Sequence, residues 1–215
     1  MLDCTAMMIV RNGEDYIEQC LRVIAPHVKR IKVAIDSRSK DKTGMIVLSL
    51  TAEFPHIEVS TFTIGNPKVD LVAMRNYQLS FNEEWGFIVD SDEYHQDISK
   101  YQLGDEDAYA LQCWSVWDKT HAHRSSSKPV IGRFFRNRTN LEWRGKWGKE
   151  MLYCGDEKVF ENIALLPYKY IHFTHIKKDK WREEMRQKRV ADGKYLVAMP
   201  DDIIKTINEI HAQKM

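Results

Sequence analysis

The sequence lacks the features that would place the chain in a membrane or on a highly charged partner. No apolar run approaches the roughly 18 residues that a membrane-spanning helix needs. Residues 1–5 lack a basic segment followed by an apolar one, so we expect no secretion signal and a cytoplasmic location. The 32 basic and 31 acidic side chains leave a net charge of +1. This balance argues against a global field for nucleic acid or anionic lipid.

Paired cysteines, repeats and glycine-rich loops are also missing. The four cysteines are widely spaced and form no C-x-x-C motif: Cys4, Cys20, Cys113 and Cys154. This spacing argues against structural zinc and favours free thiols in a reducing compartment. No glycine-rich phosphate loop lies near the N-terminus, which argues against a sugar-1-phosphate nucleotidyltransferase. What is present is an ordinary globular composition, with 43% hydrophobic and 29% charged residues among 215.

Strand and helix patterns alternate over the first hundred residues. Hydrophobic spacing predicts strands at residues 5–10, 31–35, 57–62 and 87–89, and helices at residues 14–25, 45–53 and 69–81. Such repeated βα units predict an α/β fold with a mostly parallel sheet. After residue 97 we expect strands at 108–117 and 130–135, β structure at 143–152 and 159–163, a strand at 171–173, and helices at 179–190 and 201–212. Residues 118–128 read as a polar loop.

The acidic segment after residues 87–89 carries the strongest chemical signal. Asp90, Asp92 and Glu93 follow the apolar strand directly. The carboxyl end of a strand in an open α/β sheet is where ligands bind. Carboxylates crowded there repel each other unless a cation lies between them, and oxygen ligands suit Mg²⁺ or Mn²⁺. A solvated acidic turn is the alternative interpretation.

Several segments together resemble the family-two type of GT-A glycosyltransferases. They are MIVRNGEDYIEQCL (8–21), DSRSKDKT (36–43), AMRN (73–76), DSDE (90–93), RFFRN (133–137) and WRG (143–145), followed by Glu150 and His172. The resemblance covers about residues 7–190. It implies a Rossmann-like GT-A sheet flanked by helices, with a smaller antiparallel β part in the second half. We expect one domain over residues 1–215, with a nucleotide-sugar-binding half (1–97) and an acceptor-facing half (98–215).

The resemblance implies a nucleotide-sugar site in the first half. The residues it assigns to donor binding are Val10, Arg11, Asn12, Asp36, Arg75, Asp90 and Ser91. Asp36 would accept hydrogen bonds from uracil or ribose, or else only cap a turn. Arg75 would pair with the diphosphate, support Asp36, or form a surface ion pair. Arg11 would lie near the nucleotide or be a surface charge.

The same resemblance implies a divalent ion, Mn²⁺ or Mg²⁺. Asp92 is expected to bind the ion directly, with Asp90 and His172 completing the set, and His175 is the alternative to His172. Glu93 is expected to support a ligand or to orient the acceptor. The alternative for His172 is a satisfied core histidine.

The catalytic residues implied are Asp92 and a general base, which is Glu150 by position. Asp118 and Glu142 are the reserve candidates for the base, and an exposed strand carboxylate is the alternative interpretation of Glu150. Four tryptophans in the second half would form an acceptor platform or pack in the core: Trp114, Trp117, Trp143 and Trp147. The polar loop 118–128 could close over the donor. The basic residues within 177–189 most simply form a solvated face.

These expectations point to a metal-dependent glycosyltransferase. It would move a sugar from a nucleotide-diphosphate sugar, expected to be a UDP-sugar, to a glycan or other hydroxyl acceptor with inversion. One alternative is a catalytically silent nucleotide- or glycan-binding module. Another is a D-x-D phosphohydrolase, which normally carries the motif on its first strand with Thr four residues after the first Asp; here that position is Tyr94. The pattern predicts neither the sugar, the acceptor nor the oligomeric state.

Overall fold

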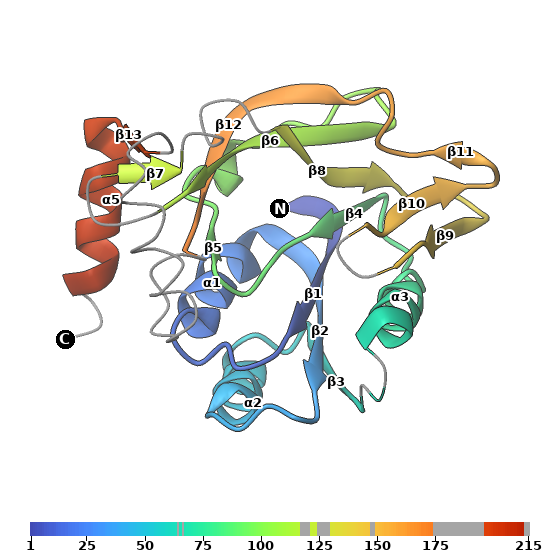
Figure 1. Ribbon diagram of the computed structural model, residues 1–215, viewed down its shortest axis with the longest axis horizontal. Helices are drawn as coiled ribbons and strands as arrows, with labels where there is room; N and C mark the ends of the chain where they lie inside the picture. Colours follow the sequence, from blue (N-terminus) through green and yellow to red (C-terminus); the bar gives the residue numbers. More distant parts are fainter. Residues whose placement is uncertain are drawn as a thin grey trace.

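The computed structural model describes residues 1–63, 65, 67–116, 121–123, 130–146, 149–173 and 196–212. An eight-stranded mixed sheet forms its centre, in the order β3-β2-β1-β4-β8-β6-β12-β5 (Figure 1). The strands are β1 (Leu2–Val10), β2 (Val28–Asp36), β3 (Ile57–Phe62), β4 (Trp85–Ile88), β5 (Glu93–Tyr94), β6 (Ala108–Ser115), β8 (Val130–Arg136) and β12 (Ala164–His172). Strands from both halves of the chain therefore share one sheet.

Strand direction decides which residues meet at each edge of this sheet. β1, β2, β3 and β4 are mutually parallel, and β8 runs antiparallel to both β4 and β6. β6 and β12 are parallel to each other, so β12 runs in the same direction as β4. The carboxyl ends of β1, β2, β4 and β12 consequently lie along one edge.

Helices cover both faces of the first half of the sheet. α1 (Ile17–Ile24) and α2 (Thr43–Glu53) pack on one face, and α3 (Pro67–Gln78) packs on the other beside a small antiparallel sheet (Figure 1). That sheet contains β9 (Leu141–Arg144), β10 (Met151–Cys154) and β11 (Glu157–Lys158). β7 (His121–His123) pairs with β13 (Leu196–Ala198), followed by α5 (Asp201–Ala212).

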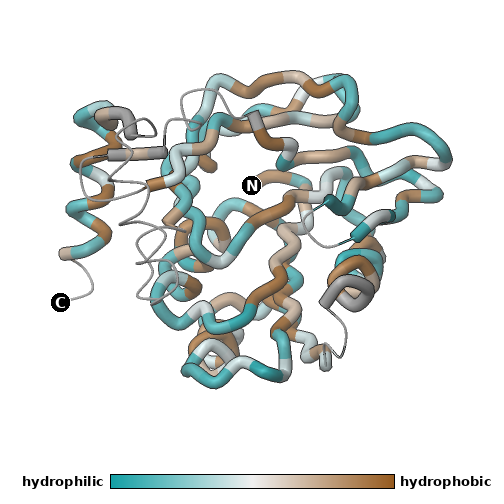
Figure 2. The backbone as a smooth tube through the Cα atoms, in the orientation of Figure 1, coloured by the Kyte–Doolittle hydropathy of each residue, from teal (hydrophilic) through white to brown (hydrophobic). Residues whose placement is uncertain are grey.

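Alternating side chains divide the core between the two faces of the sheet. Phe87 and Phe134 stack with ring centroids 4.2 Å apart on the face that α1 and α2 cover. Their neighbours Ile88 and Phe135 point to the opposite face, with α3 and β9. This period of two is the strand pattern, and Figure 2 shows the hydrophobic residues concentrated along the central strands.

The predicted α/β class is confirmed, and the strand 57–62 and the helix 201–212 have the predicted bounds. The β structure expected at 143–152 is present as two strands, β9 and β10, which pair antiparallel, and Gly145, directly after β9, has φ +114°. The strand expected at 159–163 is wrong: β11 ends at Lys158 and β12 begins at Ala164. The strand expected at 171–173 is the end of nine-residue β12. The predicted helix 179–190 lies outside the described residues.

Two further findings concern the membrane and the thiols. None of the helices in the described ranges is long and apolar enough to cross a membrane. All four cysteines are unpaired; Cys4, Cys20 and Cys113 are buried and Cys154 is half-buried.

Candidate functional site

The acidic segment forms a tight turn at the carboxyl edge of the sheet. Just after β4, the Val89 N–H donates to the Met7 carbonyl of β1. The Glu93 N–H then donates to the Asp90 carbonyl at 3.1 Å, and this bond closes the turn. The chain then reverses into β5, where Glu93 pairs with His172 at the end of β12. Two segments that are distant in sequence therefore meet where β4 and β12 end.

Asp92 and His172 form a close pair at this meeting point. His172 Nε2 lies 3.4 Å from Asp92 Oδ1, and the Phe173 N–H donates to the Asp92 carbonyl at 2.9 Å. Burial by itself would lower the pKa of His172, but Asp92, Cys113 and Glu93 raise it well above its usual value. The pairing places His172 at the acidic turn, as the sequence predicted.

A group of three side chains at the turn has the donors for a divalent ion. Ligand atoms of Asp90, Glu93 and His172 all lie within 4.8 Å of one another. Carboxylate oxygens with one imidazole nitrogen suit Mn²⁺, and hard oxygen donors also suit Mg²⁺, so the residues fit the ion implied by the sequence. The group contains Glu93 where the sequence pattern favoured Asp92. Asp92 as a direct ligand stays a prediction.

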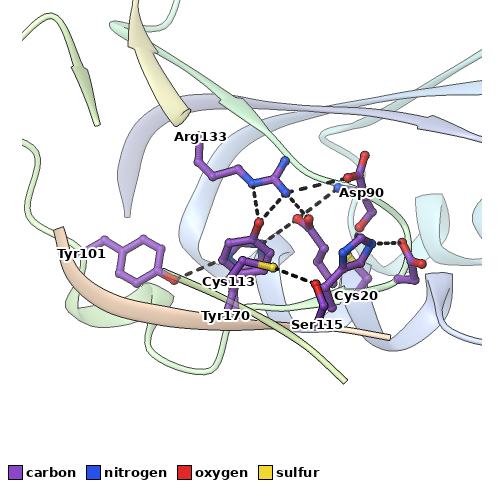
Figure 3. A network of polar contacts seen from close by, with 11 residues as sticks. Cys20, Asp90, Tyr101, Cys113, Ser115, Arg133 and Tyr170 are labelled. Atoms are coloured by element: carbon purple, nitrogen blue, oxygen red, sulfur yellow. Dashed lines mark hydrogen bonds and ion pairs between the residues drawn. The ribbon is translucent and has the colours of Figure 1, made fainter. Parts of the chain in front are cut away.

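Arg133, Tyr170 and Asp90 belong to one polar network at the acidic turn (Figure 3), and Glu93 contacts Arg133, His95 and the Asp90 N–H within it. Arg133 Nη2 contacts Glu93 Oε1, while His95 Nε2 lies 3.2 Å from Glu93 Oε2. The Arg133 guanidinium also donates to the Tyr170 hydroxyl from Nε at 3.2 Å and from Nη2 at 2.6 Å. Nη2 is in addition 3.8 Å from Asp90 Oδ2. The network joins the acidic turn to β8 and β12.

Burial sets the proton affinities in this network. Desolvation raises the pKa of Glu93 to about 8; Arg133 opposes this and Asp90 adds to it. Desolvation also lowers the pKa of His95 well below its usual value, with a contribution from Arg133. A neutral His95 can donate from Nε2 to Glu93 and accept at Nδ1 from the Tyr101 hydroxyl, which is 3.3 Å away.

Asp36 occupies the same edge at the end of β2. It is 1% exposed, and Arg38 donates to both carboxylate oxygens, with Nε at 3.0 Å from Oδ1 and Nη2 at 2.7 Å from Oδ2. Arg11 Nε lies 3.8 Å from Oδ2. Hydrogen bonding from Arg38 is the main cause that lowers the pKa of Asp36. The carboxylate is therefore ionised and flanked by two guanidinium groups.

Side-chain hydrogen bonds join the loops after β1 and β2. The Asn12 N–H donates to Ser39 Oγ at 3.2 Å, and the Lys40 N–H donates to Asn12 Oδ1 at 2.9 Å. Asn12 has φ +52°, a left-handed conformation that asparagine tolerates better than most residues. The Gly13 N–H donates to Thr43 Oγ1 at 2.7 Å. These bonds hold Arg11 and Asn12 beside Asp36.

Gly13 also connects these loops to the acidic turn. A Cβ atom added there would lie 2.6 Å from Val10 Cγ2 and 3.2 Å from Ser91 Oγ. Ser91 is buried at this contact. The structure thus brings together five of the predicted donor-binding residues with Asp90, at the ends of β1, β2 and β4: Val10, Arg11, Asn12, Asp36 and Ser91.

Arg75 and Glu150 form an ion pair of their own, in which Arg75 lies on α3 and Glu150 lies between β9 and β10. Arg75 Nε lies 3.6 Å from Glu150 Oε1, and the Arg75 guanidinium lies 4.9 Å above the Trp143 ring. The Glu150 Oε2 atom is buried and has no hydrogen-bond partner among the residues that the structure describes. Among the described contacts, none joins Arg75 to Asp36, whose arginine partners are Arg38 and Arg11. Support of Asp36 by Arg75 is therefore not what the structure shows.

The remaining candidates have mixed outcomes. Trp114 and Trp143 are buried, which is the core-packing alternative. Glu142 is exposed and pairs with Arg144 at 2.7 Å. Trp117, Asp118, Trp147 and His175 lie outside the described residues, as does most of the loop 118–128. Sequence reasoning had noted Arg133 within RFFRN without a role and had missed His95 and Tyr170.

A hollow of about 740 Å³ lies between α1, the start of α2 and β5, and its lining includes Glu14, Glu18, Lys42 and Tyr94. None of the predicted site residues lines it. We therefore locate the site by its converging acids and histidine rather than by the size of a cavity.

Comparisons with known proteins give distant structural likenesses only. No protein-family model matches the sequence, and a search of curated proteins finds no match. The chain is similar to TarS of S. aureus (TM-score 0.44, 19% identity, 64% of this chain and 28% of that chain). It is also similar to the mannosyltransferase PcManGT from Pyrobaculum calidifontis, solved in complex with GDP-Man and Mn²⁺ (0.44, 16%, 62% and 44%). A third likeness is the inositol-1-phosphate CTP transferase from T. maritima (0.40, 6%, 84% and 94%). The chain spans less than half the length of the first two.

Proposed function

We propose that this chain is a metal-dependent glycosyltransferase that uses a nucleotide-diphosphate sugar, with a UDP-sugar as the expected donor. The observation that carries the proposal is the placement of Asp36 and of the group of Asp90, Glu93 and His172 along one edge of the sheet. β2 and β4 flank β1, so their ends are about 10 Å apart, from a strand spacing of about 4.8 Å. This span suits a nucleoside at Asp36 whose diphosphate extends to the acidic turn.

The proposed division of labour follows from burial and charge. Asp36 accepts hydrogen bonds from the nucleoside, and Arg11 and Arg38 supply positive charge beside it. Asp90 and His172 would hold Mn²⁺ or Mg²⁺ together with Asp92, the ligand that the sequence resemblance implies. The ion would offset the negative charge that develops on the diphosphate as the sugar bond breaks.

The acceptor side of the proposal rests on Glu150. Among the described residues, no partner contacts its buried Oε2 atom, which leaves that oxygen as the proposed proton acceptor. Its Oε1 atom faces Arg75, which would hold the carboxylate in place. A base at this position would take the proton of a glycan or other hydroxyl acceptor in an inverting transfer.

A turnover assay tests this function. We expect the purified protein to release UDP from at least one sugar of a UDP-sugar panel, with Mn²⁺ required. Asp92→Asn and Glu150→Gln should each lower turnover by at least about 100-fold. Glu161→Gln, at an exposed residue that pairs with Lys158, is the matched control and should keep full activity. Release that needs no metal, or that survives both substitutions, would refute the proposal.

A further inference from the structure

The environment of Glu93 differs from that of an open metal ligand. Its Oε1 atom is engaged by Arg133, and its Oε2 atom is shared between His95 and the Asp90 N–H, which donates at 3.2 Å. The side chain is 0% exposed. Both oxygens of this carboxylate are thus already used inside the protein, and neither faces solvent.

Asp90, in contrast, has a backbone fixed by hydrogen bonding and a carboxylate that is open to solvent. Its backbone N–H is fixed by Glu93, and its Oδ2 atom lies 3.8 Å from Arg133 Nη2. Its carbonyl lies 3.5 Å from Cys20 Sγ. The Asp90 side chain itself is 43% exposed. Glu93 and Arg133 therefore contact Asp90 at two points and leave its carboxylate accessible.

Arg133 is in turn rigidly placed. Its guanidinium donates twice to the Tyr170 hydroxyl on β12 and lies 4.8 Å from the centre of the Tyr170 ring (Figure 3). His95 stacks on that ring at 4.9 Å and meets Phe87 edge-on at 5.0 Å. A cation fixed by so many contacts can hold a neighbouring carboxylate in one orientation before any ligand arrives.

We propose that Glu93 and Arg133 form a clamp that positions Asp90 for the metal, and that Glu93 is not itself a ligand. The inference rests on the proposed metal-dependent function. Glu93 lies within reach of the ion only because it fixes the backbone of Asp90 and pairs with His172 in the sheet. Residues that orient a ligand contribute strongly to metal affinity although they do not touch the ion.

The Arg133→Lys variant tests whether Glu93 positions Asp90 or binds the ion itself, because the two roles predict different changes in Mn²⁺ affinity. Lysine keeps the charge but cannot contact Glu93, Tyr170 and Asp90 at once. If Glu93 and Arg133 form a clamp, the variant should bind Mn²⁺ about tenfold more weakly. If Glu93 is a ligand, weakening its bond to Arg133 frees an oxygen, and affinity should stay equal or rise. The Mn²⁺ dissociation constant is measured by electron paramagnetic resonance of the free ion.

Leu50→Ala is the matched control for general loss of stability. Leu50 is buried on α2, and the described contacts do not join it to Glu93, Arg133 or Asp90. We expect a lower melting temperature with an unchanged Mn²⁺ dissociation constant. Weaker Mn²⁺ binding equal to that of Arg133→Lys would overturn the clamp, because the effect would then follow stability alone.

Glu93→Gln keeps the test decisive if Arg133→Lys does not fold. The amide retains an acceptor for the Asp90 N–H. If Glu93 is part of a clamp, Glu93→Gln should therefore lose less Mn²⁺ affinity than Asp90→Asn does. Equal loss in the two variants would make Glu93 a ligand and overturn the inference. If the wild-type protein binds no Mn²⁺ at all, the proposed function fails instead, and the two failures are distinguishable.

Discussion

Glu83 and Glu93 stand at the two ends of the short segment that contains β4, and their environments differ. Both side chains are buried and both face an arginine: Glu83 is 9% exposed beside Arg30, and Glu93 is 0% exposed beside Arg133. Yet their proton affinities move in opposite directions. Burial alone would raise the pKa of Glu83, but hydrogen bonds from Thr5 and Arg30 lower it to about 2. Desolvation raises the pKa of Glu93 to about 8.

The difference lies in burial and in hydrogen bonding, because each arginine also lies near a second acid: Arg30 pairs with Glu58, and Arg133 lies near Asp90. Glu83 accepts from the Thr5 hydroxyl at 2.6 Å and from Arg30 Nε at 3.0 Å, and these bonds favour its ionised form. Glu93 is fully buried, so desolvation outweighs the attraction of Arg133 and makes its ionisation costly. A costly arrangement of this kind is typical of functional sites, whereas Glu83 simply stabilises the amino edge of the sheet.

Removing the arginine from each pair should give the largest difference in stability between the two sites. Arg133→Met removes the guanidinium that joins Glu93 and Tyr170, and because Glu93, with a pKa of about 8, can take up a proton, we expect the free energy of unfolding to fall by about 2–3 kcal/mol. Arg30→Met removes a partner that is 34% exposed, and we expect a loss of about 1 kcal/mol or less. Urea denaturation of the two variants measures both values. Equal losses would mean that burial does not separate the two pairs.

The pH dependence of stability tests the contacts of Glu83 with Thr5 and Arg30. Its folded-state pKa of about 2 lies below the ordinary value of 4.5, so its contribution is full above pH 4.5 and is lost as the pH falls toward 2. Glu83→Gln should therefore be less stable than wild type at pH 7 by about 2–3 kcal/mol. The gap between the two proteins should close between pH 4.5 and pH 2, as followed by thermal unfolding. A gap of constant size across that range would contradict the pairing with Thr5 and Arg30.

Glycine substitutions extend the comparison to the loops beside the acidic turn. Gly13→Ala places a methyl group 2.6 Å from Val10 Cγ2, and we expect a loss of about 1–3 kcal/mol in the free energy of unfolding. Gly44→Ala is the matched control on α2, where an added Cβ meets nothing within 4 Å. It should stabilise the protein by about 0.5–1 kcal/mol through helix propensity. Destabilisation by both changes would argue against close packing at Gly13.

Much of the fold follows from local patterns in the sequence. The apolar spacing of Ile17, Leu21 and Ile24 matches a buried helix face, and Pro26 lies where α1 ends. The alternation of Ile57 to Phe62 matches β3. Local signals failed where long-range pairing decides the outcome. β12 extends over nine residues because it pairs with β6, a contact that the short apolar run at 171–173 does not reveal.

The candidate site could be predicted only in part for the same reason. The placement of Asp90 and Asp92 was predictable because they follow an apolar strand pattern directly, whereas that of His172 came from the family resemblance. The role of Arg133 was not predictable, since its contact with Glu93 joins residues 40 positions apart and depends on β8 lying beside β4. His95 offered no motif, and only burial between Phe87 and Tyr170 explains its place.

Titration calorimetry with UDP tests the central claim most directly. The claim is that a nucleoside diphosphate binds through a divalent ion at the carboxyl edge. Wild type and Glu83→Gln, at the opposite edge, should both bind UDP with Mn²⁺ present and should lose that binding when the ion is chelated. Asp90→Asn should fail to bind UDP with Mn²⁺. Absence of UDP binding to the wild-type protein with Mn²⁺, or unchanged binding in Asp90→Asn, would contradict the account.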